Sequence, residues 1–364
     1  MPSRTAPSPT PRPTARSETR RRGFHKAASW GGIALALAAT YVFFGSSPAG
    51  AKAALGSFPP LVVMTVRGFL GGAVLTVWAL ASGAQRPDMR RLVSSFLVGT
   101  LILAFGAGIG TIGQQTVASG VVGVLSAMMP LIAACLGYVL FRERPAKQAV
   151  IGLIIGFAGI ALLLRPGSNV NMFGALLVVV AQIFWGFGAV LAPRLRLPED
   201  PRLAAGLELL GGSAILLIAS AAWGEFHTLR LAAVSSTSWL GLGWLVLTAI
   251  GGFTAYGFLV KRVSSSVATT FAYVNPVVAV GLGWLLFSEP VTVRMLVATA
   301  VVVTGVCLIV SAGGPEPERR RHHHPMTSGH GHTRWQSPNE PRPDQQVYAS
   351  PLINEDAVTE DVHG

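Results

Sequence analysis

The sequence feature that most limits the possible folds is a long stretch without charge. From Leu92 to Phe141 the chain contains no Asp, Glu, Lys or Arg. Roughly 20 apolar residues carry a helix across the hydrocarbon core of a bilayer, so this stretch has room for two crossings. Backbone groups inside lipid must pair within their own segment, which favours helices, and the short alternating segments of a membrane barrel do not occur. The sequence therefore predicts an all-α membrane protein.

The composition extends this prediction to most of the chain. Hydrophobic residues make up 51% of the sequence and charged residues 12%, against about a quarter charged in a soluble domain. Ten apolar segments are long enough to be transmembrane helices, and we number them as spans one to ten. They cover residues 28–46, 59–81, 92–112, 119–141 and 147–165 in the first half, and 173–193, 203–223, 239–260, 267–287 and 291–312 in the second.

A repeated segment indicates that the two halves are copies. Pro130–Glu143 and Pro276–Glu289 align without a gap. Five spans per half reverse the direction of the second copy, so span nine crosses the membrane opposite to span four. Two inverted five-helix repeats are typical of secondary transporters, whose binding site lies near the midplane between the repeats. The identical pairs are Pro130/Pro276, Ala133/Ala279, Leu136/Leu282, Gly137/Gly283, Leu140/Leu286, Phe141/Phe287 and Glu143/Glu289.

The duplication divides the chain into four parts. Residues 28–166 form repeat one with spans one to five, and residues 167–313 form repeat two with spans six to ten. Residues 1–27, rich in Pro, Ser, Thr and Arg, are expected to be a disordered basic arm. Residues 314–364 are expected to be a disordered, His- and Pro-rich cytoplasmic tail, and metal sensing by its histidines is the alternative. Those histidines are His322, His323, His324, His330 and His332.

The distribution of Lys and Arg predicts the orientation. If the N-terminus is cytoplasmic, the 28 Lys and Arg residues gather almost entirely in the inner loops and the two tails. The positive-inside rule then places both termini in the cytoplasm of a multi-pass inner-membrane protein. The basic residues form no groove or aromatic-interleaved patch, so the net charge of +12 does not indicate a nucleic-acid partner. The exceptions are Lys52, Arg165, Arg230 and Arg294 in outer loops and Arg67 inside a span.

Two charged residues stand inside spans and are the candidate coupling or gating residues. Arg67 lies in span two and Glu208 in span seven, and the residues after them match in the same register. Ionisable groups at membrane depth are functional candidates. Their backbones enter from opposite faces, so they differ in depth by about 8 Å for a 1.5 Å rise per residue. Snorkelling of Arg67 and a structural partner for Glu208 are the alternatives.

Two prolines predict the position of a substrate cavity. Pro130 and Pro276 lie in mid-span, where each frees a carbonyl one turn earlier, and such a group is tolerated where it meets protein or a wet cavity. Glu143 and Glu289 end the duplicated segments at opposite faces and are expected to fix the following turn against cations such as Arg144 or Arg294. The predicted cavity residues are Tyr41, Phe44, Gln114, Gln115, Met129, Pro130, Gln182, Trp185, Tyr256, Tyr273, Asn275 and Pro276.

Other motifs add little chemistry. Cys135 and Cys307 lie in apolar segments and are interpreted as buried small residues; no zinc spacing occurs, so neither a metal site nor a cofactor is expected. No Walker A motif occurs, so ATP is not expected to drive the protein directly. Small-residue pairs permit close helix contact, within one chain or in a homodimer. These pairs are Gly68/Gly72, Gly106/Gly110 and Gly152/Gly156.

The sequence between Gly31 and Ile309 resembles the drug/metabolite transporter superfamily, in particular proteins with two EamA domains and among them the YedA-like exporters. The resemblance implies the ten-helix fold with both termini cytosolic. It also implies a central cavity lined by spans one, three, four, six, eight and nine, and export of small organic solutes such as amino acids, metabolites or drugs. The segments that carry it are YVFFGSS (Tyr41–Ser47), PPLVVMTVR (Pro59–Arg67), ASGVVGVLSAMMPL (Ala118–Leu131), GLIIGFAGIALLL (Gly152–Leu164) and SSVATTFAYVNPVVAVGLG (Ser265–Gly283).

The main hypothesis is a non-enzymatic secondary transporter in the lipid bilayer that exports a small molecule by alternating access. Coupling to a proton through Glu208 is part of that hypothesis. Two alternatives belong to other classes. A membrane-embedded enzyme would need clustered His, Asp, Glu or Cys, whereas the spans offer isolated charges. A sensor without transport activity would depend on the His-rich tail.

Overall fold

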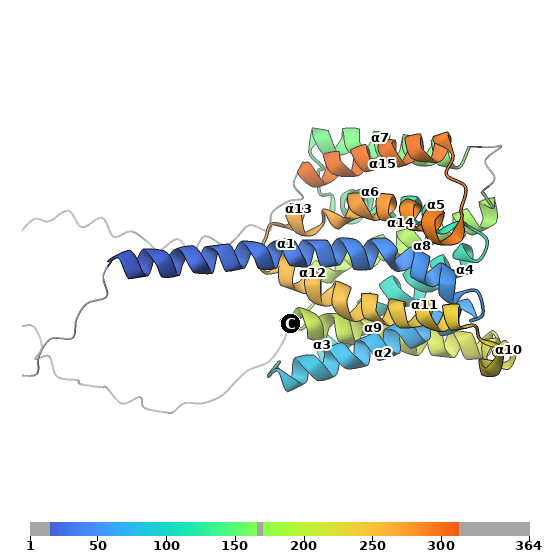
Figure 1. Cartoon of the computed structure of the whole chain (residues 1–364), viewed down its shortest axis with the longest axis horizontal. Helices are drawn as coiled ribbons and strands as arrows, with labels where there is room; N and C mark the ends of the chain where they lie inside the picture. Colours follow the sequence, from blue (N-terminus) through green and yellow to red (C-terminus); the bar gives the residue numbers. More distant parts are fainter. Residues whose placement is uncertain (1–14, 166–169, 313–364) are drawn as a thin grey trace, which may run out of the picture. The chain divides into compact units, whose positions relative to one another are not determined.

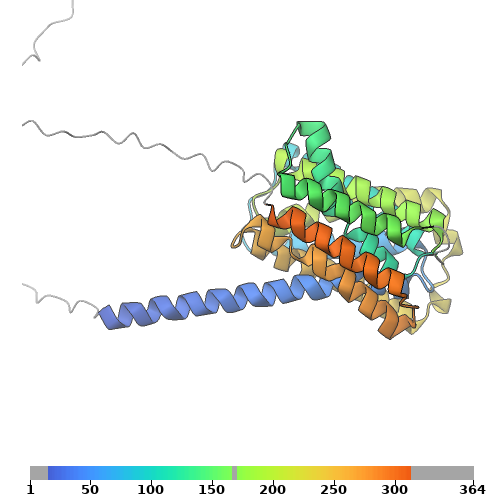
Figure 2. The same cartoon turned by 90° about the horizontal axis from the view of Figure 1, so that it is seen from above.

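The structure is a computed structural model that describes residues 15–165 and 170–312. The predicted tail 314–364 with its histidines lies outside the described residues, as do residues 1–14 of the predicted N-terminal arm. The described part is helical throughout, as the sequence predicts, and no strand occurs in it. Figures 1 and 2 show its helices lying alongside one another in a bundle.

The helices follow the predicted spans in chain order. Repeat one contains α1 (Ala15–Ala54), α2 (Pro60–Ala81), α3 (Met89–Gly99), η1 (Thr100–Gly108), α4 (Ile109–Gln114), α5 (Ser119–Ser126), α6 (Met129–Phe141) and α7 (Lys147–Leu163). Repeat two begins with α8 (Met172–Leu191), η2 (Ala192–Arg194), α9 (Pro201–Ala222), α10 (Glu225–Thr228) and η3 (Leu231–Ala233). It continues with α11 (Ser236–Leu247), η4 (Thr248–Gly252), α12 (Phe253–Val260), α13 (Ser265–Ala268), α14 (Phe271–Phe287) and α15 (Val293–Ser311).

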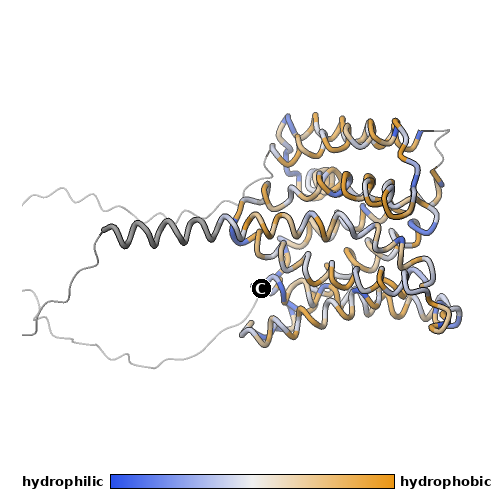
Figure 3. The backbone as a smooth tube through the Cα atoms, in the orientation of Figure 1, coloured by the Kyte–Doolittle hydropathy of each residue, from blue (hydrophilic) through white to orange (hydrophobic). Residues whose placement is uncertain are grey.

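Membrane-spanning length is reached by most of these segments. Eight of the described helical segments are long and apolar enough to cross a bilayer, and α7 and α14 are shorter apolar helices of 17 residues. Seventeen residues is the lower end of the range for a crossing. Figure 3 shows that hydrophobic residues make up most of the length of these helices. Many large apolar side chains are exposed, among them Val77, Ile154 and Phe173 at 67%, 66% and 71%. Such a surface suits lipid and not water.

Corresponding helices of the two repeats pack against each other in opposite directions. A Cβ built on Gly72 of α2 would lie 2.7 Å from the oxygen of Gly206 in α9. Further back along α2, Gly68 faces Leu209, so residue numbers fall on one helix as they rise on the other. Helices α7 and α15 repeat this pattern, with Gly152 against the Gly305 oxygen at 2.6 Å. Only glycine permits such backbone contact, and the antiparallel pairing is the geometry of inverted repeats.

Polar caps determine where several helices begin. Asp88 starts α3 by accepting a hydrogen bond from the Arg91 amide at 2.8 Å, and Asn171 starts α8 by accepting from the Gly174 amide at 2.9 Å. Asp200 starts α9 and also pairs with the Arg202 guanidinium at 2.8 Å. That hydrogen-bonded guanidinium lowers the pKa of Asp200 to about 2. These caps lie at the ends of the apolar segments, where the sequence turns polar.

The helices around the prolines differ from the expectation in two places. Span one was predicted to end at residue 46, but α1 continues to Ala54 with Pro48 inside it. Span four is broken into α5 and α6, and Pro130 lies in the first turn of α6, where its missing N–H costs nothing. Pro276, its counterpart, lies inside α14, and the break of span nine comes before it, at residues 269–270 between α13 and α14. Both copies of this span are therefore in two helical pieces, but the break lies at different positions relative to the shared proline.

Candidate functional site

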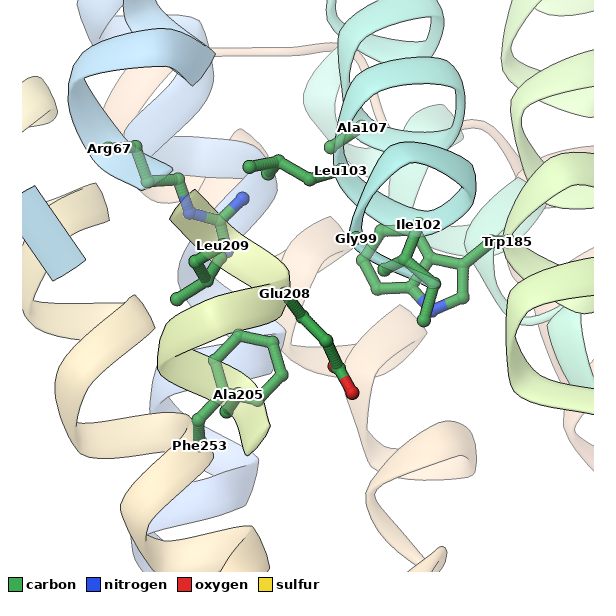
Figure 4. A pocket seen from close by; sticks show the side chains of 10 residues that line it. All are labelled: Arg67, Gly99, Ile102, Leu103, Ala107, Trp185, Ala205, Glu208, Leu209 and Phe253. Atoms are coloured by element: carbon green, nitrogen blue, oxygen red, sulfur yellow. The ribbon is translucent and has the colours of Figure 1, made fainter. Parts of the chain in front are cut away.

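One small cavity in the bundle is lined by both intramembrane charges. Arg67 projects from α2 and Glu208 from α9, and Figure 4 shows their side chains with those of their neighbours. The cavity measures about 20 Å³, which is room for about one water molecule. The sequence predicted both charged residues as functional candidates, and the structure brings them to the same cavity. The other lining residues are Gly99, Ile102, Leu103, Ala107, Trp185, Ala205, Leu209 and Phe253.

Two π-helical segments shape this cavity. Segment η1 interrupts span three, and η4 interrupts span eight, which is its counterpart in the second repeat. Ile102 and Leu103 of η1 line the cavity, and Phe253 follows directly after η4. A π-turn shifts the helix register and redirects the side chains around it, and such turns often occur at functional sites. The apolar residues in these segments gave no sequence signal for this irregularity.

The Arg67 guanidinium is buried without a full set of partners. Its residue is 7% exposed. Its Nη1 lies 3.7 Å from the Met64 sulfur, a weak acceptor, and no acceptor for its Nε occurs among the described residues. A buried polar group without a partner costs free energy. Arg67 is therefore buried at a cost, and the alternative that it snorkels to the surface is not what this geometry shows.

The Glu208 carboxylate does not pair with Arg67. Figure 4 shows the carboxylate directed away from the guanidinium. No ion pair joins Arg67 and Glu208 within residues 15–165 and 170–312. The backbone of Glu208 is held tightly, because a Cβ on Gly99 of α3 would collide with it. The site therefore presents a positive and a negative group separately on its walls.

Aromatic side chains extend from this cavity toward α1 and α14. Phe253 contacts Phe44 of α1, with ring centroids 5.8 Å apart. Phe44 also packs against Phe271 at 5.1 Å and Tyr256 at 6.5 Å, and the Tyr41 hydroxyl lies 2.7 Å from the Thr270 hydroxyl. Tyr41, Phe44, Tyr256 and Trp185 of the predicted set therefore lie in one region around Phe253.

The remaining predicted cavity residues are more dispersed. Gln114 is buried and its Nε2 donates to the Pro48 carbonyl at 2.6 Å, which ties α4 to α1. Gln115 is exposed in the turn before α5. Gln182 is buried on α8, and Met129 and Pro130 are half-buried at the break in span four. Tyr273, Asn275 and Pro276 lie along α14, where the Asn275 Oδ1 is buried and has no partner among the described residues.

Several residues of this region were not predicted. Phe253, Phe271 and Thr270 join the aromatic part, and Gly99 and Leu103 form walls of the cavity. The pair Gly251–Gly252 directly before Phe253 was the one available signal, since it lets Phe43 and Phe44 approach the backbone. The apolar wall residues look like any other lipid-facing or core residue in the sequence.

A larger groove lies elsewhere, between α14 and α15. It measures about 500 Å³ and its lining includes Val277, Trp284 and Leu296, which are all more than half exposed. Its walls carry no charged side chain. An open apolar groove on the lipid-facing surface does not offer the chemistry of a selective polar site.

Removing the Arg67 guanidinium tests whether this group lacks hydrogen-bond acceptors in the folded protein. Arg67→Met should keep or raise the melting temperature, because an unsatisfied buried donor costs about 1–3 kcal/mol and methionine fills a similar volume. Arg202→Met is the control, since it removes a guanidinium that is paired with Asp200 and should lower stability slightly. Thermal unfolding in detergent measures both. A loss for Arg67→Met larger than for Arg202→Met would contradict an unpaired guanidinium.

Comparisons with known proteins agree on the kind of protein. The sequence profile described as "EamA-like transporter family" matches residues 30–165 and again 172–311. The chain is 37% identical over 279 residues to "Uncharacterized inner membrane transporter YedA" of Escherichia coli K12, covering 75% of this chain and 89% of that protein. It is 27% identical over 280 residues to "Uncharacterized transporter YvbV" of Bacillus subtilis, covering 76% and 90%.

A solved crystal structure shows the same fold. It superposes with a TM-score of 0.55 at 18% sequence identity, covering 76% of this chain and 96% of the other. At this identity the likeness concerns the fold alone. Together with the twofold profile match, it confirms the duplicated all-helical membrane fold that the repeated segment predicts.

Proposed function

The chain belongs to the EamA-like transporter family, and from this premise we propose that it exports small organic solutes by alternating access. Membrane transport follows from the family and from the transporters it resembles. Amino acids, metabolites or drugs are the solute classes of the proposal. The observation that carries it is the antiparallel pairing of the corresponding helices α2 and α9 beside a small cavity with two separate charged groups. Inverted halves around a midplane site are the architecture in which rocking exposes the site to each side in turn.

Glu208 is the proposed coupling residue. A carboxyl group that lines a small cavity at membrane depth can bind and release one proton as the cavity changes access. Arg67 on the opposite wall is the proposed gating partner, because its guanidinium lacks a full set of acceptors in this arrangement. In this scheme the two groups respond to the substrate and the proton and do not form a fixed ion pair.

Reconstituted flux tests the function. Purified protein in liposomes loaded with mixed labelled amino acids, organic acids and cationic dyes should release at least one class faster than protein-free liposomes. The direction of a pH gradient should change the rate. Absence of release for every class, from protein that is shown to be folded by its melting transition, would contradict export of small solutes.

The proposed orientation has both termini in the cytoplasm, and it follows from the Lys and Arg distribution. Reporter fusions after Arg144 and after Ser288 should report opposite sides of the membrane, with Arg144 in the cytoplasm. Paired fusions of a reporter active in the periplasm and one fluorescent in the cytoplasm make each position its own control. Both positions on the same side would contradict the inversion.

A further inference from the structure

A single carboxylate joins spans four and nine at one end of the bundle. Glu289 follows α14, and its Oε1 accepts a hydrogen bond from the Ser119 amide at 2.8 Å. Its Oε2 accepts from the Ser119 hydroxyl at 2.9 Å and from the Gly120 amide at 3.0 Å. The carboxylate therefore occupies donors in the first turn of α5, where a negative charge is favoured. These bonds connect the end of a span in repeat two to the start of a span in repeat one.

The helices beneath this carboxylate touch through their backbones (Figure 1). A Cβ built on Gly123 of α5 would collide with that of Ala279 in α14. One built on Gly120 would lie 3.2 Å from the Val280 Cα. Ser119 and Ala279 have no exposed surface. Helices α5 and α14 therefore close against each other at this end of the bundle.

The same local device occurs at the end of α6. Glu143 and Glu289 each follow a residue in the left-handed conformation, with φ of 55° and 51°. The amide of each glutamate donates to the carbonyl of a matched glycine, Gly137 at 3.3 Å and Gly283 at 3.2 Å. A Cβ on either glycine would meet the Oε2 of its glutamate. The identical Gly and Glu pairs of the repeated segment thus fold the carboxylate back over the helix end.

The two carboxylates have different partners. Glu289 holds the start of α5, whereas Glu143 binds the guanidinium of Arg194 at the end of η2. Arg194 is fixed over the Phe141 ring, 3.7 Å from its centroid. In the register of the repeat, the segment that corresponds to the start of α5 is 264–266, at the start of α13 and directly before predicted span nine. In this structure Glu289 is therefore bound to the start of α5, whereas Glu143 is bound to Arg194 and not to the segment 264–266.

A break between the two helical pieces of span four allows α5 to move relative to α6. Helix α5 ends at Ser126 and α6 begins at Met129. Helix α5 packs on α14, whereas α6 packs mainly on α8. Two rigid pieces joined by a short break can change their mutual angle without disturbing either helix. The α5 piece can therefore leave α14 while α6 remains in place.

We propose that Glu289 and Glu143 are a pair of alternating latches, of which Glu289 closes the Ser119 end in this structure. In the opposite state Glu289 releases α5, and Glu143 leaves Arg194 for residues 264–266 at the start of α13. The positive-inside rule assigns the Ser119 end to the outside, so Glu289 is the outer latch. This inference rests on the proposed transport by alternating access and supplies residues that control it.

Distances between spin labels test the latches directly. Glu289→Gln should raise the population of the state open at the Ser119 end about tenfold, since it removes the charge from three hydrogen bonds. Arg194→Met should shift the population in the same direction, because it frees Glu143. Glu199→Gln, on an exposed carboxylate paired with Arg91, is the neutral control. The label pairs are Gln115→Cys with Pro290→Cys at the Ser119 end and Arg144→Cys with Lys261→Cys at the other end, in a chain with Cys135→Ala and Cys307→Ala.

The outcome is decided by distance and not by transport. A longer, broader Gln115–Pro290 distance in Glu289→Gln, with a shorter Arg144–Lys261 distance, supports the latches. An unchanged distribution in both variants overturns them. If Glu289→Gln does not fold, Ser119→Ala removes one bond and should give a smaller shift of the same sign. Because the labels report without a substrate, failed flux in the parent protein would contradict the transport proposal and leave this measurement decisive.

Discussion

Glu208→Gln should abolish the response of export to a pH gradient while leaving the protein folded. If one proton is exchanged per solute, a gradient of one pH unit supplies 1.36 kcal/mol and supports about tenfold accumulation. Glutamine keeps the shape of the side chain but cannot bind or release the proton. The accumulation ratio should therefore fall from about tenfold in the parent protein to about one in the variant. Liposomes with an imposed gradient and a labelled substrate measure this ratio.

The control for this substitution is another carboxylate. Glu199→Gln removes a charge that is exposed and paired with Arg91 at 3.3 Å, and it should leave the accumulation ratio unchanged. Downhill exchange of labelled for unlabelled substrate should survive in Glu208→Gln, because this exchange needs no proton. Gradient-driven accumulation at the parental level in Glu208→Gln would remove Glu208 from coupling.

Gly99→Val should prevent stable folding. Gly99 lies where α3 crosses α9, and a built Cβ would stand 2.6 Å and 2.8 Å from the Glu208 carbonyl carbon and Cα. Backbone atoms cannot move aside by changing rotamer, so the crossing itself must open. The same crossing includes Gly212, whose built Cβ would lie 2.5 Å from the Gly99 oxygen. We expect a loss larger than the roughly 1–3 kcal/mol of ordinary overpacking.

Gly243→Val is the matched control. Gly243 lies in α11, and no heavy atom is within 4 Å of its built Cβ. The same substitution there should change stability by less than about 0.5 kcal/mol, as is usual for an open surface position. Fluorescence-detected size exclusion after heating compares both variants with the parent. Equal melting curves for Gly99→Val and Gly243→Val would contradict the close backbone contact between α3 and α9 at Gly99.

The sequence was most informative where the two copies share a constraint. The repeated segment Pro130–Glu143 predicted the duplication because a charge-bearing helix end and its glycine must be kept together. The ten apolar segments were visible because lipid requires apolar length. The hydrogen-bond and ion-pair partners of the two glutamates that match in register, Glu143 and Glu289, were less predictable. Arg144 and Arg294 were expected beside the two glutamates, but Glu143 binds Arg194 and Glu289 binds backbone amides of α5, since such contacts depend on how distant spans meet.

The candidate site was predicted only through its charged and polar members. Arg67, Glu208 and Trp185 reach the same cavity, whereas Gln115 stays exposed. The π-segments η1 and η4 were invisible, because their residues fit a regular apolar helix equally well. Phe253 of the cavity wall follows η4 directly. A helix register is set by tertiary packing, which a local pattern does not encode.

The glycine contacts between matching helices also bear on how this chain is made. Helix α2 emerges from the ribosome long before α9, and α7 long before α15, yet each of these early helices contacts the backbone of the later helix through its glycines. During synthesis α2 and α7 must therefore remain in the bilayer without these partners until α9 and α15 are inserted. Assembly of the bundle is thus a late event, and it is complete only after α15 is inserted and packs against α7.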